Sequence, residues 1–174
     1  FICVSTPTGP DGPLDTRNVE AAVGRLLDRA PERHGIVIRS TLPLDGPARL
    51  RAMVATRGAA RSGRPSIVTN PEFMREGSAV EDFLRPDRVV IGVNSERAEL
   101  ALRQLYRPLA AKDVPIVATS CEAAEIIKYA ANTFLATRIA FVNQLADLCE
   151  RVGADIQDVA RGMGLDKRIG LQFL

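Results

Sequence analysis

The chain has 174 residues, of which 46% are hydrophobic and 25% are charged, and its formal net charge at pH 7 is +2. This composition is typical of a globular chain with a sizeable core and excludes a disordered tail. The small net charge, without any Lys/Arg stripe, argues against a nucleic-acid partner. No stretch approaches the roughly eighteen consecutive apolar residues of a membrane-spanning helix, so we expect no membrane partner either.

The cysteines and the single histidine restrict the possible chemistry. Cys3, Cys121 and Cys149 are odd in number and far apart, without disulfide or zinc-site spacing, which predicts free thiols in a cytoplasmic protein. His34 is the only histidine, so we expect neither a Ser-His-Asp triad nor a metal site. The opening residues 1–4 have no basic region and no cleavage site, which excludes a signal peptide.

Short apolar runs alternate with amphipathic segments along the first two thirds of the chain. The runs predict buried strands at residues 1–6, 35–41, 66–70, 88–93 and 114–120. The amphipathic segments predict helices over 16–30, 46–57 and 96–109, and a polar loop joins the third and fourth strands. Apolar strands that alternate with helices predict a parallel sheet covered on both faces, which is a doubly wound, Rossmann-like α/β domain.

The pattern changes after Ser120. Residues 121–151 contain neither Gly nor Pro and are periodic at helical spacing, which predicts one long helix, followed by a shorter helix over 153–164. We therefore place a domain boundary near residue 120. Residues 1–119 are predicted to form the C-terminal part of a Rossmann-like domain, because the chain has no G-x-G-x-x-G turn, and residues 120–174 part of a central helical dimerisation domain.

Four segments, in this order, resemble the UDP-glucose/GDP-mannose dehydrogenase family. The most specific is NPEFMREGSAVEDFLRPDRVVIG at 70–92, and the others lie at 3–12, 37–43 and 123–170. Segments 70–92 and 123–170 are closer to the UDP-glucose branch. The family's glycine-rich turn and its cysteine-containing motif have no counterpart here, so we expect a fragment that is inactive alone.

The resemblance implies an NAD-dependent oxidation of UDP-glucose to UDP-glucuronate. Two successive hydride transfers would pass through a thioester on a catalytic cysteine outside this chain. A relative that acts on GDP-mannose or a UDP-N-acetyl sugar is one alternative. A sugar-nucleotide-binding and dimerisation fragment without chemistry of its own is another.

Two pairs of residues are the main catalytic candidates. Lys128 and Asn132 are four apart on the long helix and share one face. Spacing alone favours an ordinary surface pair, whereas the resemblance implies joint donation to an oxyanion.

Glu72 and Glu76 follow the third strand, where doubly wound folds bind ligands. The resemblance makes Glu72 a base or water-handling acid and places Glu76 between the sugar and the nicotinamide. From their position in the fold alone, a solvated acidic loop with Arg75 as counter-ion is an equally good interpretation. We expect all four main candidates to converge on one cleft.

The remaining candidates are one further catalytic residue, Thr41, and the residues that the resemblance assigns to binding. Thr41 would hold the attacking water, although Ser-Thr before Pro also simply begins a turn. Arg168 would reach the substrate of a neighbouring subunit, which implies a homodimer through the long helix; a surface arginine is the plain alternative. The sugar nucleotide would also contact Phe73, Met74 and Arg75, and the NAD site would include Val4, Ser5, Thr6, Pro7, Thr8, Ser40, Thr41, Leu42 and Glu76.

Overall fold

The computed structural model describes residues 1–9, 12–29, 35–57 and 65–173. His34, Ala30 at the end of the first predicted helix and the middle of the loop at 6–15 lie outside these ranges. The chain divides into two compact units, Phe1–Lys128 and Tyr129–Leu174. The division falls within the predicted long helix, so the boundary near residue 120 stays a proposal.

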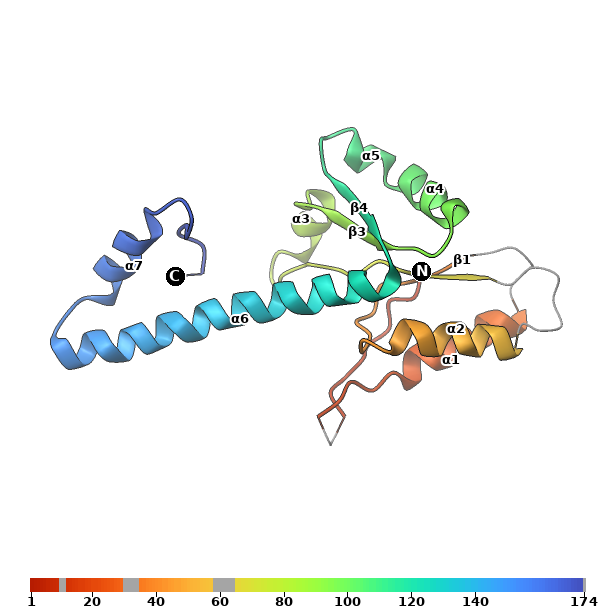
Figure 1. The fold of residues 1–174 in the computed structure, drawn as a ribbon, viewed down its shortest axis with the longest axis horizontal. Coiled ribbons are helices and arrows are strands. Elements are labelled where there is room, and N and C mark those ends of the chain that lie inside the picture. Colours follow the sequence, from red (N-terminus) through yellow and green to blue (C-terminus); the bar gives the residue numbers. More distant parts are fainter. Residues whose placement is uncertain (10–11, 30–34, 58–64, 174) are drawn as a thin grey trace. The chain divides into compact units, whose positions relative to one another are not determined.

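The first unit contains a four-stranded sheet in the order β1-β2-β3-β4 (Figure 1). Strands β1 and β2 are parallel, as are β3 and β4. The first predicted strand is represented by Ile2, which makes a parallel bridge to Ile38. The strands are β1 (Gly35–Ile38), β2 (Ser66–Thr69), β3 (Val89–Gly92) and β4 (Ile116–Thr119).

Strands β2 and β3 pair antiparallel, through Thr69 and Gly92 alone, which differs from a wholly parallel sheet. Parallel neighbours need a crossover connection, usually a full helix. The segment 70–88 holds only the short helix α3 (Ala79–Leu84), so it returns to the sheet without crossing it. The ends of all four strands consequently meet, because Thr69 also pairs with Ile38, and Gly92 with Thr119.

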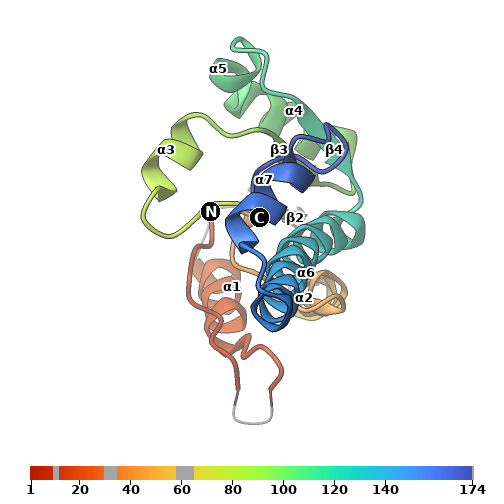
Figure 2. The ribbon, with the colours of Figure 1, turned by 90° about the vertical axis from the view of Figure 1, so that its left-hand side faces the viewer.

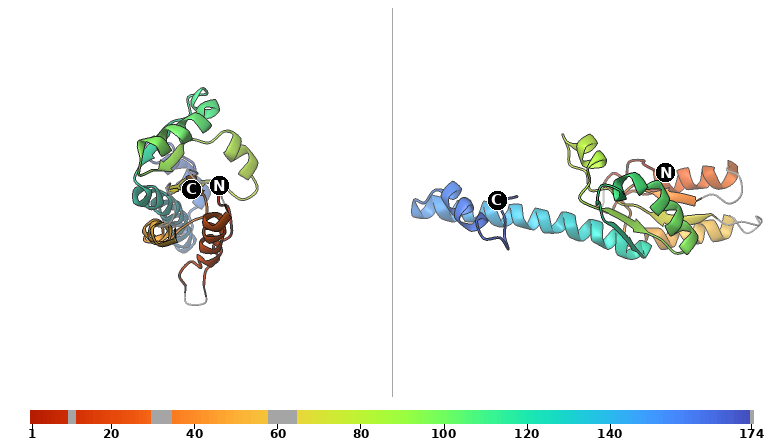
Figure 3. Two further views of the ribbon diagram at one scale, coloured as in Figure 1. Left: turned by 90° about the vertical axis from the view of Figure 1, so that its right-hand side faces the viewer. Right: turned by 90° about the horizontal axis from the view of Figure 1, so that it is seen from above.

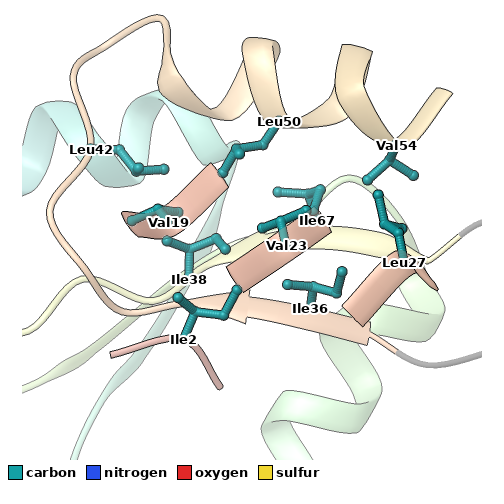
Figure 4. Packing of buried hydrophobic residues seen from close by; sticks show 10 residues of the cluster. All are labelled: Ile2, Val19, Val23, Leu27, Ile36, Ile38, Leu42, Leu50, Val54 and Ile67. Atoms are coloured by element: carbon teal, nitrogen blue, oxygen red, sulfur yellow. The ribbon is translucent and has the colours of Figure 1, made fainter. Parts of the chain in front are cut away.

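Both faces of the sheet are covered, as the apolar runs predicted. Helices α1 (Arg17–Arg29) and α2 (Gly46–Arg57) lie side by side on one face, and α4 (Glu96–Leu105) and α5 (Arg107–Ala110) on the other (Figures 2 and 3). Alternate residues of β1 point to opposite faces, so Ile36 and Ile38 join one core and Val37 the other. The first core, shown in Figure 4, consists of Ile2, Val19, Val23, Leu27, Ile36, Ile38, Leu42, Leu50, Val54 and Ile67.

The long helix is α6 (Cys121–Val152), close to its predicted bounds, and the shorter one is α7 (Ile156–Gly164). The predicted helix at 96–109 divides at Tyr106 into α4 and α5, because Pro108 lacks the N–H that a continuous helix would use. Helix α3 was not predicted. It has only six residues, fewer than the roughly 11-residue window in which helical periodicity is read, and its apolar side chains Val80, Phe83 and Leu84 are exposed.

The second unit contains most of α6, with α7 and the segment that follows. Gly153 adopts a φ of 72° directly after α6, a left-handed conformation that commonly ends helices. The side chain of Asp155 caps α7 by accepting the backbone N–H of Gln157 at 2.8 Å. Arg138 of α6 donates to the carbonyl of Ile169 at 3.0 Å and thereby holds the last described residues against the helix.

Candidate active site

An ammonium and a carboxylate meet where the strand ends converge. Lys128, on the second turn of α6, is only 5% exposed, and its Nζ donates to Oε1 of Glu72 at 2.9 Å and to the Glu72 carbonyl. Helix α6 reaches this place because a Cβ on Gly92 would lie 2.7 Å from Cα of Cys121, so only glycine allows the helix to pack so closely on β3. The structure therefore joins Lys128 and Glu72, two of the five predicted catalytic residues.

The carboxylate of Glu72 is ionised near neutral pH. Burial on its own would raise its pKa, but the hydrogen bonds from Lys128 and from the backbone N–H of Met74 outweigh that effect and lower the pKa. The Met74 N–H lies 2.7 Å from Oε2, so each carboxylate oxygen has a donor. Glu72 is thus held in one orientation and carries a negative charge.

Asn70 anchors the segment that carries Glu72, and sequence analysis did not single it out. It is 1% exposed, and its Oδ1 accepts from Arg39 at 2.8 Å and from the hydroxyl of Tyr106. Its Nδ2 donates to the carbonyl of Val90 at 2.8 Å. These bonds tie the ends of β1, β2 and β3 to the start of α5. An Asn-Pro pair directly after an apolar strand was the available signal.

The ring of Phe73 lies close to two cations. The guanidinium carbon of Arg88 is 3.9 Å from the ring centroid, and Nζ of Lys128 is 5.4 Å from it. Both distances are within the range of cation–π attraction. The half-buried ring therefore helps to hold Lys128 beside Glu72.

The rest of the predicted substrate loop faces outward. Met74, Arg75 and Glu76 are exposed. Arg75 is the partner of Asp82 on α3, at 2.6 Å, and not of the loop glutamates. Its guanidinium, together with the backbone N–H of the same residue, lowers the pKa of Asp82. Among the described residues, no hydrogen bond or ion pair joins Glu76 to Lys128 or Glu72.

The predicted cofactor residues come from two neighbouring segments. Ser40 Oγ donates to the carbonyl of Val4 at 2.6 Å, so the segments after Ile2 and after β1 lie side by side. The side chain of Asn18 donates to the carbonyl of Ser5 at 3.2 Å. Ser5, Pro7 and Thr8 are exposed, whereas Val4 and Thr6 are half-buried.

Thr41 is half-buried, and its neighbour Leu42 is 1% exposed with its side chain in the first core. Leu42 therefore presents its backbone, not its side chain, to its surroundings. Its N–H donates to Oε2 of Glu125 at 3.4 Å. Glu125 is a second buried polar residue that sequence analysis missed; the signal was its position three residues before Lys128, on the same helical face.

Asn132 and Arg168 belong to the second unit. Asn132 is exposed and lies four residues after Lys128 on α6. The side chain of Arg168 is 90% exposed and forms a forked ion pair with Asp166, with a shortest distance of 2.7 Å.

The thiol of Cys121 is not available for catalysis. It is 1% exposed, burial raises its pKa, and its Sγ lies 3.2 Å from the carbonyl of Gly92. Among the described residues, no group of three or more His, Cys, Asp or Glu side chains is placed to hold a metal ion. Within the same ranges, no helix is both long and apolar enough to pass through a bilayer.

Taken together, a sheet covered on both faces and a polar cluster at the strand ends, where doubly wound folds bind ligands, define a Rossmann-like α/β domain. Residues 1–110 match the NAD binding domain of the UDP-glucose/GDP-mannose dehydrogenase family, and residues 122–174 match its central domain. The chain belongs to this family.

Individual relatives agree with this assignment. The chain is 45% identical over 174 residues to the UDP-glucose 6-dehydrogenase of Rickettsia felis, covering 100% of the chain and 38% of the relative. A UDP-glucose dehydrogenase structure from Pyrobaculum islandicum superposes with a TM-score of 0.90 at 43% identity, covering 99% of the chain and 40% of that protein. A GDP-mannose dehydrogenase structure from Pseudomonas aeruginosa gives 0.85 at 29% identity, covering 95% and 38%. The chain thus spans about two fifths of the length of these relatives.

Proposed function

We propose that the complete protein that carries this chain oxidises UDP-glucose to UDP-glucuronate with NAD. The observation that carries the proposal is the buried ammonium of Lys128, paired with the ionised Glu72 where the strand ends meet. The higher identity to the UDP-glucose enzymes than to the GDP-mannose enzyme supports UDP-glucose as the substrate.

Lys128 supplies the positive charge that the reaction needs. Oxidation of an alcohol through an aldehyde and a thioester develops negative charge on oxygen, which a buried ammonium stabilises more than water does. Asn132 adds an amide donor one helical turn further on. In this proposal, the substrate oxygen binds close to Nζ, beside the Glu72 oxygens.

Glu72 and Thr41 handle protons and water. An ionised carboxylate accepts a proton from the alcohol or from the attacking water, and Thr41 holds that water by its hydroxyl. Because Cys121 is buried with a raised pKa, we assign the thioester to a cysteine outside residues 1–174.

The residues around Val4 and Ser40 fit the nicotinamide end of NAD. They combine backbone groups with the hydroxyls of Ser5, Thr6, Thr8 and Ser40, next to the Glu72 segment. We assign Val4–Thr8 and Ser40–Leu42 to this site, with Glu76 between the nicotinamide and the sugar. NAD bound there supplies the acceptor for the hydride.

A homodimer completes the proposal. Within the second unit, α6 exposes Phe134, Phe141 and Leu148, at 62%, 48% and 54%. They are seven residues apart, so they form one apolar stripe of the kind that pairs helices. Arg168, with an exposed guanidinium, then extends to the sugar nucleotide of the partner subunit.

Free thiols suggest the compartment. Cys3, Cys121 and Cys149 are unpaired, as in proteins kept in a reducing environment, so we propose a cytoplasmic location. Fractionation of cells that express the complete protein, followed by immunoblotting, tests it; recovery outside the cytoplasm would exclude it.

The decisive experiment is a substrate panel with the complete protein. UDP-glucose, GDP-mannose and an N-acetylated UDP-sugar are compared by NADH formation. We expect two NADH per UDP-glucose and a kcat/KM at least roughly tenfold above the others. A preference for GDP-mannose would overturn the substrate, and no NADH with any sugar would overturn the activity. Residues 1–174 alone should form none; turnover by them would refute an external catalytic thiol.

A further inference from the structure

Glu125 is a buried carboxyl for which the proposed chemistry has no use. It is 1% exposed, on the turn of α6 before Lys128. Its Oε2 accepts the backbone N–H of Leu42 at 3.4 Å, and no ion pair joins it to another described residue. Its neighbours Leu42 and Ala124 are equally buried, at 1% and 0%.

Such a group does not stabilise the fold. Burial in apolar surroundings raises the pKa of Glu125 to about 7, against the hydrogen bond from Leu42 and the charge of Lys128. Apolar side chains of similar volume commonly stabilise such positions at least as well as ionisable ones. The carboxyl is therefore better explained by the group that it binds than by stability.

The Leu42 N–H that Glu125 binds belongs to the peptide that follows Thr41. The side chain of Leu42 is fixed in the core, where its Cβ approaches Gly46 so closely that a Cβ there would lie 2.8 Å away. The peptide between Thr41 and Leu42 is thus held at one end by packing. Its orientation, and with it the position of Thr41, is set by the acceptor of the Leu42 N–H.

We propose that Glu125 is a positioning residue that fixes the peptide between Thr41 and Leu42 against the turn of α6 that carries Lys128. This role rests on the proposed function, because it matters only if Thr41 and Lys128 act on one substrate. Thr41 lies in the segment that follows β1, and Lys128 lies on α6. The hydrogen bond from the Leu42 N–H to Glu125 joins these two elements. A misplacement of about 1 Å in such a constellation lowers turnover by up to roughly a hundredfold.

Three variants of the complete protein test the role. Glu125→Leu removes the acceptor, Glu125→Gln keeps an acceptor oxygen, and Glu122→Gln is the matched control, since Glu122 pairs with Arg51 instead. We expect E125L to lower kcat roughly 10- to 100-fold while the KM for UDP-glucose stays within about threefold. E125Q should keep at least about a third of the parental kcat, and E122Q all of it. Parental kcat in E125L, or equal loss in E125Q and E125L, would overturn the proposal.

A second measurement does not depend on activity. Hydrogen exchange of the Leu42 amide should accelerate at least roughly tenfold in E125L and remain parental in E125Q and E122Q. The melting temperature of E125L should not fall, which separates a positioning role from a structural one. Unchanged Leu42 exchange in E125L would refute the contact. If the parent turns over no nucleotide sugar, the proposed function fails, while the exchange result still decides the contact.

Discussion

Nζ of Lys128 lies 2.9 Å from Oε1 of Glu72, a residue 56 positions earlier in the chain. The side chain of Lys128 is 7% exposed. Its ammonium would be costly to bury without this carboxylate. The pair therefore holds a positive and a negative charge at the strand ends.

Replacing Lys128 by Met should lower kcat of the complete protein roughly 10²- to 10³-fold, the usual effect of losing one oxyanion donor. Steady-state NADH formation measures this. Lys112→Met is the control, because Lys112 is an exposed lysine of the same unit. Near-parental turnover in K128M would remove Lys128 from the mechanism.

Glu72→Gln should change the acid side of the stability profile. The folded-state pKa of Glu72 lies below its ordinary value of 4.5, so its ion pair stabilises the fold above pH 4.5 and is lost as the pH falls through the lower, folded-state pKa. Urea unfolding should therefore show parent and E72Q diverging as pH rises from strongly acidic to neutral. The exposed Glu150 provides a control, and E150Q should follow the parent. Parallel curves for E72Q and the parent would contradict the pair.

Glu125 should affect the pH dependence of stability in a different pH range from Glu72 and with the opposite sign. Its folded-state pKa of about 7 exceeds the ordinary 4.5, so the folded state holds the proton longer than the unfolded state does. Stability should fall between pH 4.5 and about 7, by up to about 3 kcal/mol at ~1.4 kcal/mol per pKa unit, and level off above.

The Glu125→Gln variant isolates this effect, since it cannot titrate. Its free energy of unfolding should be flat over that window, measured by urea unfolding in matched buffers. A parental slope in E125Q would mean that another group titrates there.

Asn70→Ala should destabilise the first unit by roughly 2–4 kcal/mol, since each buried polar group left without a partner costs about 1–3 kcal/mol. The groups affected are Arg39, the Tyr106 hydroxyl and the Val90 carbonyl. Chemical denaturation measures the loss. Asn94→Ala, at an exposed position, should change stability by less than about 0.5 kcal/mol. Equal effects of both variants would show that the Asn70 bonds contribute nothing.

Phe141→Glu should weaken the proposed dimer by about 2 kcal/mol or more, because it introduces a charge into the apolar stripe of α6. Light scattering across a dilution series reports the mass. Asn143→Glu adds the same charge at an exposed position off the stripe and should leave the mass unchanged. A monomeric parent, or a dimer that F141E does not weaken, would reject this interface.

Local patterns determined most of the secondary structure. Helix α2 has the predicted bounds Gly46–Arg57, and α6 extends only to Val152 beyond the predicted end. Hydrophobic periodicity is a short-range property, so it detects any helix with a buried stripe. It did not reveal α3, which is too short at six residues for a periodic pattern to stand out. Nor could it reveal the antiparallel pairing of Thr69 with Gly92, which depends on how a distant segment returns to the sheet.

Sequence by itself placed Lys128 and Glu72 among the candidates, through residue type and family resemblance. Only the tertiary structure decided which candidates meet. Glu122 and Glu125 are three residues apart on one helix and look alike in sequence. The side chain of Glu122 is 45% exposed and pairs with Arg51, whereas Glu125 is 1% exposed and accepts the N–H of Leu42. The difference arises because burial and charge pairing depend on the elements packed against a residue, and those elements come from elsewhere in the chain.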